Sequence, residues 1–484
     1  VAAVLRPKFV VAPGPERTVS HTWFDTFDWR LHTAGISLEY VDDGPLTAQL
    51  PDGTRVAGPR PAGDGPLQVD DLPAGRLREA LRPIVAPRAL LPVVTLRRTA
   101  CESRVLNTDE KTVARLLTES DDDGTSQLQV QPLRGYDTAG DRIARQLARI
   151  HGLTAVTTRT YDSALAHASR KPSDYNNGHV AQVRPETPAP VAIAQMLRHF
   201  AAVVDDNVSG TIAATDPEFL HDLRVAVRRS RSILKLAGDV LPGDMAARFQ
   251  PEFKWLGDLT TPVRDLDVYL LGLNDMAAGL VSADPRDLDP FRSFLARHRA
   301  AERRRLVRGL RSRRFEKLMD GWRTALAEVA ADSDGGPAVG TLARQRVERA
   351  FRRVARRGER ITADSPSEDV HKLRKRCKEL RYLLEVFRPL CAAAPHRSLI
   401  KELKALQDTL GSFQDGEVQR EAVREFAAVM MEESSAPPET VLAMGELAAQ
   451  LDADQLRARA VLAGRLQLFL ADENRARVKA LGRR

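Results

Sequence analysis

The feature that most constrains the fold of this sequence is an internal repeat in its C-terminal half. Adding 150 to the residue number superimposes the two copies without a gap over residues 221–267. Arg228 meets Lys378, which preserves the charge. The identical pairs include His221/His371, Leu223/Leu373, Arg224/Arg374, Arg231/Arg381, Leu234/Leu384, Glu252/Glu402, Lys254/Lys404, Leu256/Leu406, Asp258/Asp408 and Asp265/Asp415. A repeat that keeps charged as well as apolar positions predicts duplication of a site and not only of a scaffold.

The first part of each copy has the periodicity of an amphipathic helix with a basic stripe. At about 100° per residue, the cations of each copy fall on one narrow face. An apolar stripe lies roughly a quarter to a third of a turn away and contains Cys377, which we expect in the core. Neighbouring stripes place the cations at the edge of the core, where adjacent helices can enclose them. The basic stripe consists of His221, Arg224, Arg228, Arg231 and Lys235 in the first copy and of His371, Arg374, Lys378 and Arg381 in the second.

Two explanations of the basic stripe are open. Cations one turn apart repel each other by a few tenths of a kcal/mol per pair, so compensating negative charge is needed. Carboxylates on partner helices could supply it, and we expect Asp265 and Asp415 to pair with arginines in this way. A bound polyanion could also supply it, and the duplication of the stripe favours this explanation. Some cations of the basic segments 297–318 and 344–360 could line the same cavity, and most are expected to form a solvated face.

The net charge of +8 belongs entirely to the C-terminal part of the chain. Residues 1–180 contain 22 basic and 22 acidic residues, which cancel. Any polyanionic partner should therefore meet the C-terminal part.

The cysteine content and the hydropathy predict a soluble cytoplasmic protein. The 3 cysteines are too few and too scattered for a disulfide framework or a thiolate metal site, which predicts a reducing compartment. No signal pattern stands at the N-terminus, and no apolar run approaches the roughly 20 residues of a membrane span. We expect no membrane partner.

The distribution of apolar runs, proline and glycine along the sequence predicts an α+β protein with two domains. Residues 1–165 contain short apolar runs separated by proline and glycine, which is typical of strands and turns. Residues 166–190 have few apolar anchors and are interpreted as a linker. Residues 191–484 have long helical patterns, and a glycine-rich interruption divides them into repeats 191–335 and 341–484.

The C-terminal part resembles a CHAD domain, the conserved-histidine α-helical domain, over about residues 190–484. The resemblance is carried by FLHDLRVAVRRSRSILKLAGDVLP with FKWLGDLTTPVRDLDVY, and by VHKLRKRCKELRYLLEVFRPL with LKALQDTLGSFQDGEV. It implies an all-α domain of two pseudo-symmetric four-helix bundles that binds inorganic polyphosphate in a basic groove or pore. The implied ligand-binding residues are those of the two basic stripes, with Lys254 and Lys404 as additions.

The N-terminal part resembles, less closely, a CYTH domain, whose fold is an antiparallel β tunnel for triphosphate. The resemblance is carried by TWFDTFDWRLHTAGISLEYV, VTLRRTACESRVLNTDE and LQVQPLRGYD. The family's Glu-x-Glu-x-Lys motif, which holds divalent metals, is missing when the chain is aligned on Lys8. The family's carboxylate and basic positions are occupied instead by Val4 and Arg6, by Glu39 and Val41, and by Gln129 and Gln131.

Without paired carboxylates, Mg²⁺ or Mn²⁺ cannot be held for phosphoryl chemistry. We therefore expect no cofactor, no metal site and no catalytic residue in this part. Arg97 and Arg98 could retain phosphate affinity, or could be solvated or ion-paired.

The expected function is non-catalytic binding of inorganic polyphosphate, with association with polyphosphate granules as a further hypothesis. One alternative is a metal-dependent triphosphate hydrolase in the first 160 residues. Another is a nucleic-acid-binding helical protein. The low aromatic content argues against it, because aromatic residues are only 5% of the chain and do not interleave with the basic stripes. A metal-dependent hydrolase built on His221 and Asp222 is disfavoured, because the second copy has Lys372 in place of the aspartate. The oligomeric state stays open.

Overall fold

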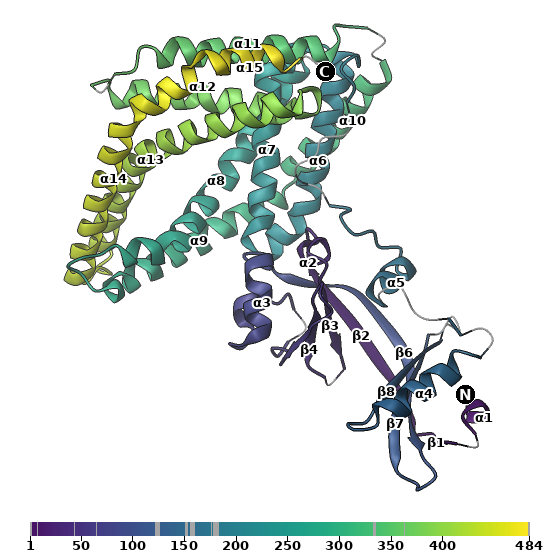
Figure 1. Ribbon diagram of the computed structural model, residues 1–484. Coiled ribbons are helices and arrows are strands. Elements are labelled where there is room, and N and C mark those ends of the chain that lie inside the picture. The colour runs from purple at the N-terminus through teal and green to yellow at the C-terminus, as the bar shows by residue number, and fades with distance from the viewer. Residues whose placement is uncertain are drawn as a thin grey trace. The chain divides into compact units, whose positions relative to one another are not determined.

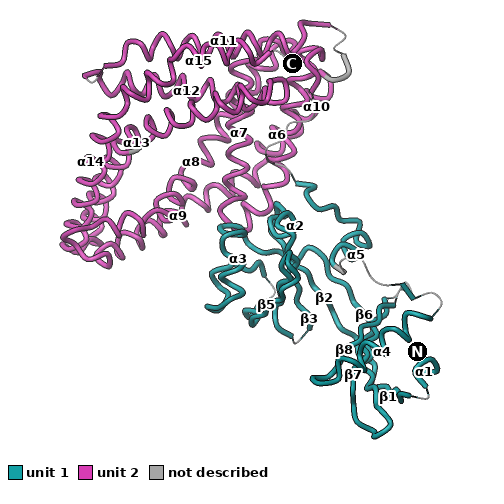
Figure 2. The backbone as a smooth tube through the Cα atoms, in the orientation of Figure 1, with its two compact units in different colours: residues 1–176 teal, residues 177–484 magenta. Residues whose placement is uncertain are grey.

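The computed structural model combines antiparallel strands in the first part of the chain with helices in the rest, which confirms the predicted α+β class (Figure 1). The chain divides into two compact units, residues 1–176 and 177–484 (Figure 2). The described residues are 2–6, 8–42, 44–63, 65–121, 126–150, 153–154, 160–175, 177, 183–332, 335–362 and 364–482, without the side chains of 160, 330–332 and 415. Part of the predicted linker 166–190 lies outside them, and the predicted domain limits stay predictions.

Unit 1 is built on one antiparallel sheet that curls into a half-barrel (Figure 1). Its strands run in the order β5-β4-β3-β2-β6-β7-β8, and β1 pairs with β6. The strands are β1 Val10–Ala12, β2 Glu16–Thr26, β3 Ser37–Val41, β4 Leu46–Gln49, β5 Arg55–Gly58, β6 Leu90–Leu106, β7 Thr112–Ser120 and β8 Ser126–Pro132. The predicted antiparallel β fold of this part is confirmed.

Short helices cover the half-barrel and complete its cores. They are α1 Ala2–Leu5, α2 Arg30–Thr33, α3 Arg76–Val85, α4 Asp137–Leu147 and α5 Thr160–His167. Leu77 and Leu81 of α3 join one apolar cluster of the sheet, and Ile143 of α4 joins another. Tyr161 of α5 packs in a third cluster that contains Trp23. The alternation of buried and exposed residues along the strands is what half-buried strands require.

The described part of unit 2 consists of two successive sets of five α-helices joined by short connections. The first set is α6 Ala189–Ala213, α7 Pro217–Ala237, α8 Met245–Ala278, α9 Asp289–Leu310 and α10 Arg313–Asp332. The second set is α11 Val339–Gly358, α12 Ser367–Val386, α13 Ala393–Glu432, α14 Pro438–Leu470 and α15 Asp472–Ala480. Each repeat has five helices where four were predicted, because its last helical stretch is interrupted, at residues 311–312 and at residue 471.

The two sets follow the 150-residue offset and are related by a local twofold arrangement. The helices α6 and α11 begin 150 residues apart, as do α7 and α12. The backbone N–H of Ala189 donates to the carbonyl of Pro337, and that of Val339 donates to the carbonyl of Thr187, both at 2.9 Å. Because each bond is the other one shifted by 150 residues and reversed, a pseudo-twofold axis passes between the two segments.

The repeats share their apolar cores at two places. The larger cluster contains the apolar stripes of α7 and α12, including Leu223, Leu373 and Cys377, all fully buried, which confirms the predicted core position of Cys377. A separate cluster joins the C-terminal end of α8 and the N-terminal end of α9 to the C-terminal end of α13 and the N-terminal end of α14. Phe291 and Met444 are among its members. The helices of the two repeats thus form a closed ring (Figure 1).

The helix α7, which carries the first basic stripe, has a well-formed N-terminus. The carboxylate of Asp216 accepts hydrogen bonds from the backbone N–H groups of Glu218 (2.9 Å) and Phe219 (3.2 Å), and a proline follows it in the first helical position. We expect Asp216→Ala to lower the free energy of unfolding by about 1 kcal/mol, because two N–H groups lose their acceptor. Urea unfolding followed by far-UV circular dichroism measures the loss. Asp216→Asn keeps the acceptor and should stay close to the wild type; an equal loss in both variants would contradict the capping role.

Candidate anion-binding site

A cavity of about 1130 Å³ lies among α7, α12, α13 and α14, and we refer to it as the central cavity. Its lining has a net excess of positive charge, which favours an anionic occupant. Among the lining residues that the structure describes, the cations are Arg228, Arg374, Lys378, Arg381, Arg457 and Arg465, and the carboxylates are Glu385, Asp408 and Asp454.

Four residues of the predicted basic stripes meet in this cavity. Arg228 comes from the first repeat, and Arg374, Lys378 and Arg381 come from the second. The guanidinium of Arg228 lies over the ring of Tyr382 on α12, 5.6 Å from the ring centre, where a cation–π interaction stabilises it. Cations of both repeats are therefore brought together, as the duplication predicts.

The other predicted site residues lie outside the lining of the central cavity. They are His221, Arg224, Arg231, Lys235, Lys254, His371 and Lys404. Two of them are ion-paired on the surface: Lys235 Nζ lies 2.9 Å from Glu379 Oε1, and Lys254 Nζ lies 2.6 Å from Asp258 Oδ2. The carboxylate explanation of the stripe therefore applies to Lys235, and Lys254 of α8 is paired with a carboxylate of its own helix.

The two predicted histidines have different surroundings. His371 Nδ1 lies 2.5 Å from Gln414 Oε1 of α13, a hydrogen bond across the bundle. Burial lowers the pKa of His221 below its usual value; Glu218 opposes this shift, and the nearby Arg264 adds to it. His221 is therefore a poor source of positive charge near neutral pH.

Side-chain size explains why the cavity lies on the second repeat. Gly411 and Gly416 line it, and the equivalent positions of the first repeat hold Thr261 and Leu266. Thr261 accepts a hydrogen bond from Arg224, and Leu266 is buried in the apolar cluster at the ends of the helices. Gly411, the equivalent of Thr261, leaves space beside Arg374, the equivalent of Arg224. Gly416 instead permits close packing of α14, because a Cβ there would lie 3.0 Å from the carbonyl oxygen of Leu451.

Carboxylates compensate part of the charge. Arg381 Nε donates to Glu385 Oε1 at 2.6 Å, and Arg229 Nη2 lies 3.7 Å from Glu385 Oε2. Burial raises the pKa of Asp265, while the charges of Arg224 and Arg264 lower it. Its predicted ion pair with an arginine stays a prediction. The side chain of Asp415 lies outside the described residues.

Two cations of the central cavity, Arg457 and Arg465 of α14, are not among the residues predicted from the sequence. Their equivalents in the first repeat are Val307 and Phe315, so comparison of the repeats cannot find them. Their spacing of eight residues, about two helical turns, is the signal that could have placed them on one face. Arg457 also forms an ion pair with Asp454 one turn earlier, which lowers its net contribution.

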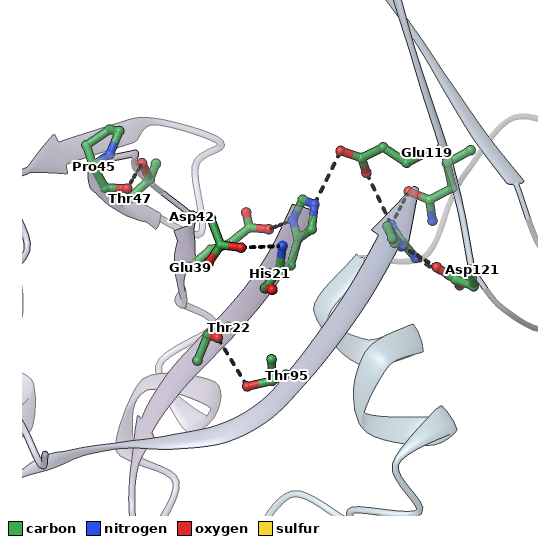
Figure 3. Close-up of polar contacts among 12 residues, drawn as sticks. His21, Thr22, Glu39, Asp42, Pro45, Thr47, Thr95, Glu119 and Asp121 are labelled. Atoms are coloured by element: carbon green, nitrogen blue, oxygen red, sulfur yellow. Dashed lines mark hydrogen bonds and ion pairs between the residues drawn. The ribbon is translucent and has the colours of Figure 1, made fainter. Parts of the chain in front are cut away.

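Unit 1 contains a second polar cluster, on the strands of the half-barrel (Figure 3). The buried His21 of β2 lies between two carboxylates: Nδ1 is 2.8 Å from Glu39 Oε1 of β3, and Nε2 is 3.3 Å from Glu119 Oε1 of β7. Burial alone would lower the pKa of His21, but Glu119 and Glu39 outweigh it and raise the pKa to about 9. His21 is therefore a buried cation at neutral pH.

Arg98 of β6 extends this cluster. It is only 4% exposed, and its Nε donates to Asp121 Oδ1 at 2.5 Å. Its Nη1 also donates to Gln127 Oε1 at 3.2 Å and lies 3.4 Å from Glu119 Oε2. Of the open alternatives for Arg98, the ion-paired one is confirmed, while Arg97 is exposed.

The carboxylates of this cluster are paired with cations of unit 1. Glu39 and Glu119 are bound to His21, and Glu119 and Asp121 are bound to Arg98. Across the residues that the structure describes, no group of three or more His, Cys, Asp or Glu side chains is arranged to hold a metal ion. Of the residues at the expected metal positions, Val4 lies in α1, and Gln129 and Gln131 are exposed on β8.

Comparisons with known proteins agree with the helical part of this description. The family model of the CHAD domain matches residues 192–424. The crystal structure of the CHAD domain from the plant Ricinus communis is 26% identical, with a TM-score of 0.52, and the match covers 60% of this chain and 95% of that one. The predicted CHAD resemblance is thus confirmed, whereas none of these matches names a CYTH domain, and that resemblance stays a prediction.

Two curated relatives come from Mycobacterium tuberculosis. They are Uncharacterized protein Rv2226 of strain H37Rv and Uncharacterized protein MT2285 of strain CDC 1551, each 29% identical over 211 residues. Each match covers 42% of this chain and 39% of the relative, so the chain spans about two fifths of the length of these relatives. Among the described helices, none has the length and apolar character needed to cross a membrane.

Proposed function

We propose that this chain, in which residues 192–424 are a CHAD domain, binds inorganic polyphosphate in the central cavity and does not catalyse a reaction. The observation that carries the proposal is the described lining of that cavity, in which cations from both repeats, six in all, face three carboxylates. A chain of phosphates with about one negative charge per unit would supply the missing negative charge. Association of the protein with polyphosphate granules follows as a hypothesis.

The residue types of the cavity suit a repetitive polyanion. Polyphosphate has no base or sugar to read, so its recognition rests on charge density and on hydrogen bonds to phosphate oxygens. Arginine can donate two parallel hydrogen bonds to such oxygens, and Lys378 adds a compact charge with three donors. The exposed Arg228 and Lys378 lie on different repeats, which allows one flexible chain to be held from two sides.

The proposal assigns no catalysis to unit 1. The carboxylates on its half-barrel neutralise His21 and Arg98, so a metal ion would have to compete with two buried cations. Metal-dependent triphosphate hydrolysis is the alternative function. Release of phosphate from tripolyphosphate that depends on added Mg²⁺ or Mn²⁺, and that persists when the central cavity is mutated, would contradict the proposal.

Nucleic-acid binding is the second alternative, and competition distinguishes it. Duplex DNA is stiff, with a persistence length of about 50 nm, and cannot follow a cavity formed within one helical unit as a single phosphate chain can. Tyr382 is the aromatic residue of the described lining, so stacking of single-stranded bases is also weak.

We therefore expect unlabelled polyphosphate to displace a labelled polyphosphate probe from the full chain at roughly tenfold lower phosphate concentration than duplex or single-stranded DNA. Fluorescence anisotropy at one fixed salt concentration measures this, because the affinity of any polyanion depends on salt. Equal displacement by DNA at equal phosphate concentration would favour a nucleic-acid ligand.

A further inference from the structure

A second basic cavity, of about 370 Å³, lies between α11 and α12, and its described lining residues are all different from those of the central cavity. We refer to it as the outer arginine cavity. Among its described lining residues, five guanidinium groups face one carboxylate. The lining residues are Arg353, Arg356, Arg357, Arg360, Ile361, Asp369 and Arg376.

Helix geometry makes this a concentrated positive surface. The four arginines of the segment 353–360 are three, one and three residues apart, so they project from one face of α11 and its C-terminal end. The partial negative charge at a helix C-terminus is only about half an elementary charge, which is too small to balance them. In the described part of the chain, ion pairs join Arg357 to Asp369 at 3.7 Å and Arg376 to Glu379 at 2.7 Å. Most of the positive charge is left for an external anion.

The equivalent face of the first repeat has a different role. The residues 150 positions before the five arginines contain no cation, and most are buried in the core: Val203, Asp206, Asn207, Gly210 and Ala226. Duplication of the scaffold alone therefore does not account for five arginines at these positions. Exposure to solvent alone also does not explain why these arginines line one cavity.

The helix α12 separates the two cavities. Arg376 lies two residues from both Arg374 and Lys378, about 200° away around the helix, so it projects from the opposite side. An α-helix with its side chains is about 10 Å across. A long phosphate chain held in the central cavity can therefore reach the outer arginine cavity, whereas a short one cannot fill both.

We propose that the outer arginine cavity is a second binding site for condensed phosphate. The ligand class rests on the proposed function, but the site has its own residues and can be tested alone. The occupant is either a distant segment of the chain that fills the central cavity or a separate short phosphate chain.

The test compares two ligands and two sets of substitutions. The outer variant, Arg353→Gln/Arg356→Gln/Arg360→Gln, removes three exposed charges and leaves the ion-paired Arg357 and Arg376 in place. The central variant is Arg228→Gln/Arg374→Gln/Lys378→Gln. The charge-matched control is Arg55→Gln/Arg76→Gln/Arg142→Gln, three exposed arginines of unit 1.

Isothermal titration with tripolyphosphate gives the number of sites. The wild-type chain and the control should bind two equivalents, and the outer and central variants should each bind one. Two equivalents in the outer variant, or one equivalent in the wild type that the outer substitutions leave unchanged, would overturn the proposal. If the outer variant bound one tripolyphosphate equivalent fewer and the central variant bound as many as the wild type, the central site would be refuted and the outer site supported.

Titration with long-chain polyphosphate identifies the occupant. A loss of about tenfold in affinity in the outer variant indicates that one long chain spans both cavities. An unchanged affinity for the long chain, with one tripolyphosphate equivalent lost, indicates a separate short chain. Both outcomes support the outer site.

Discussion

The variant Arg228→Gln/Arg374→Gln/Lys378→Gln is expected to bind long-chain polyphosphate about 100- to 1000-fold more weakly than the wild-type chain. Each substitution removes a charged hydrogen-bond donor from the lining of the central cavity. Hydrogen bonds to charged groups contribute about 1.5 to 3 kcal/mol each, and exposure to solvent reduces this to about 1 to 1.5 kcal/mol at this site. Three such contacts give roughly 3 to 4.5 kcal/mol, since each 1.4 kcal/mol is a factor of ten.

The salt dependence of the affinity should change together with its magnitude. For a single-stranded polyanion, the slope of log K against log salt is about −0.7 for each phosphate contact. Removing three contacts should therefore reduce the slope by about 2. Fluorescence anisotropy of a labelled chain over a series of salt concentrations gives both quantities.

Two controls separate the site from general charge. Arg55→Gln/Arg76→Gln/Arg142→Gln removes the same net charge from exposed positions of unit 1 and should change the affinity by less than about threefold. Far-UV circular dichroism should show that the helices of unit 2 are intact in the cavity variant, because two of the three substituted side chains are exposed and the third is half-buried. A cavity variant with wild-type affinity and slope would refute the assignment of the site.

The helices that carry the site could be predicted because their period and their repetition are both recorded in the sequence. The stripe on α12 fixes which face Arg374, Lys378 and Arg381 share, and the copy on α7 supplies Arg228. The stripe does not predict which side of the helix lines a cavity. That depends in part on Gly411 of α13, whose consequence is visible only when it is compared with Thr261 in the folded first repeat.

The contribution of α14 to the lining of the central cavity could not be predicted for a related reason. Arg457 and Arg465 have no basic counterparts in the first repeat, and their place in the cavity depends on how α14 packs along α13. The outer arginine cavity illustrates the same point. Its arginines are visible as a basic segment, but Arg376 belongs to a helix whose opposite side serves the central cavity, and only tertiary packing brings these cations around one hollow.

In unit 1, the strands and turns could be predicted from short apolar runs, but the polar cluster could not. From the sequence, Glu39 stands out only because it occupies a position where the CYTH resemblance implies a basic residue. Its partner His21 is a diagonal neighbour across β2 and β3, a relation that depends on the pairing of Trp23 with Glu39. The pairing of β6 with β7, which begins at Thr99 and Ser120, similarly places Arg98 beside Asp121.

The stability of unit 1 is expected to fall as the pH rises from about 7 to about 10, because His21 loses its proton there. The folded-state pKa of about 9 lies above the ordinary value of 6.5. A group with a raised pKa stabilises the fold fully below its unfolded pKa, and this stabilisation is lost as the pH rises through the folded value. A shift of this size corresponds to about 3 kcal/mol at most, and we expect about 2 to 3 kcal/mol. Glu119 acts in a separate, acidic window, because His21 and Arg98 lower its pKa.

His21→Gln should therefore unfold about 2 to 3 kcal/mol more easily than the wild type at pH 7 and should show no slope between pH 7 and 9. Urea unfolding of the full chain followed by tryptophan fluorescence measures this, since Trp23 stacks against His21 with ring centres 5.9 Å apart. The tryptophans of unit 2 contribute equally to both proteins and cancel in the difference. His32→Gln, a substitution of a histidine whose side chain is 33% exposed, is the matched control and should keep the wild-type slope. If His21→Gln kept that slope as well, the buried His21 would be neutral in the folded state, and its two carboxylates would be available for other partners.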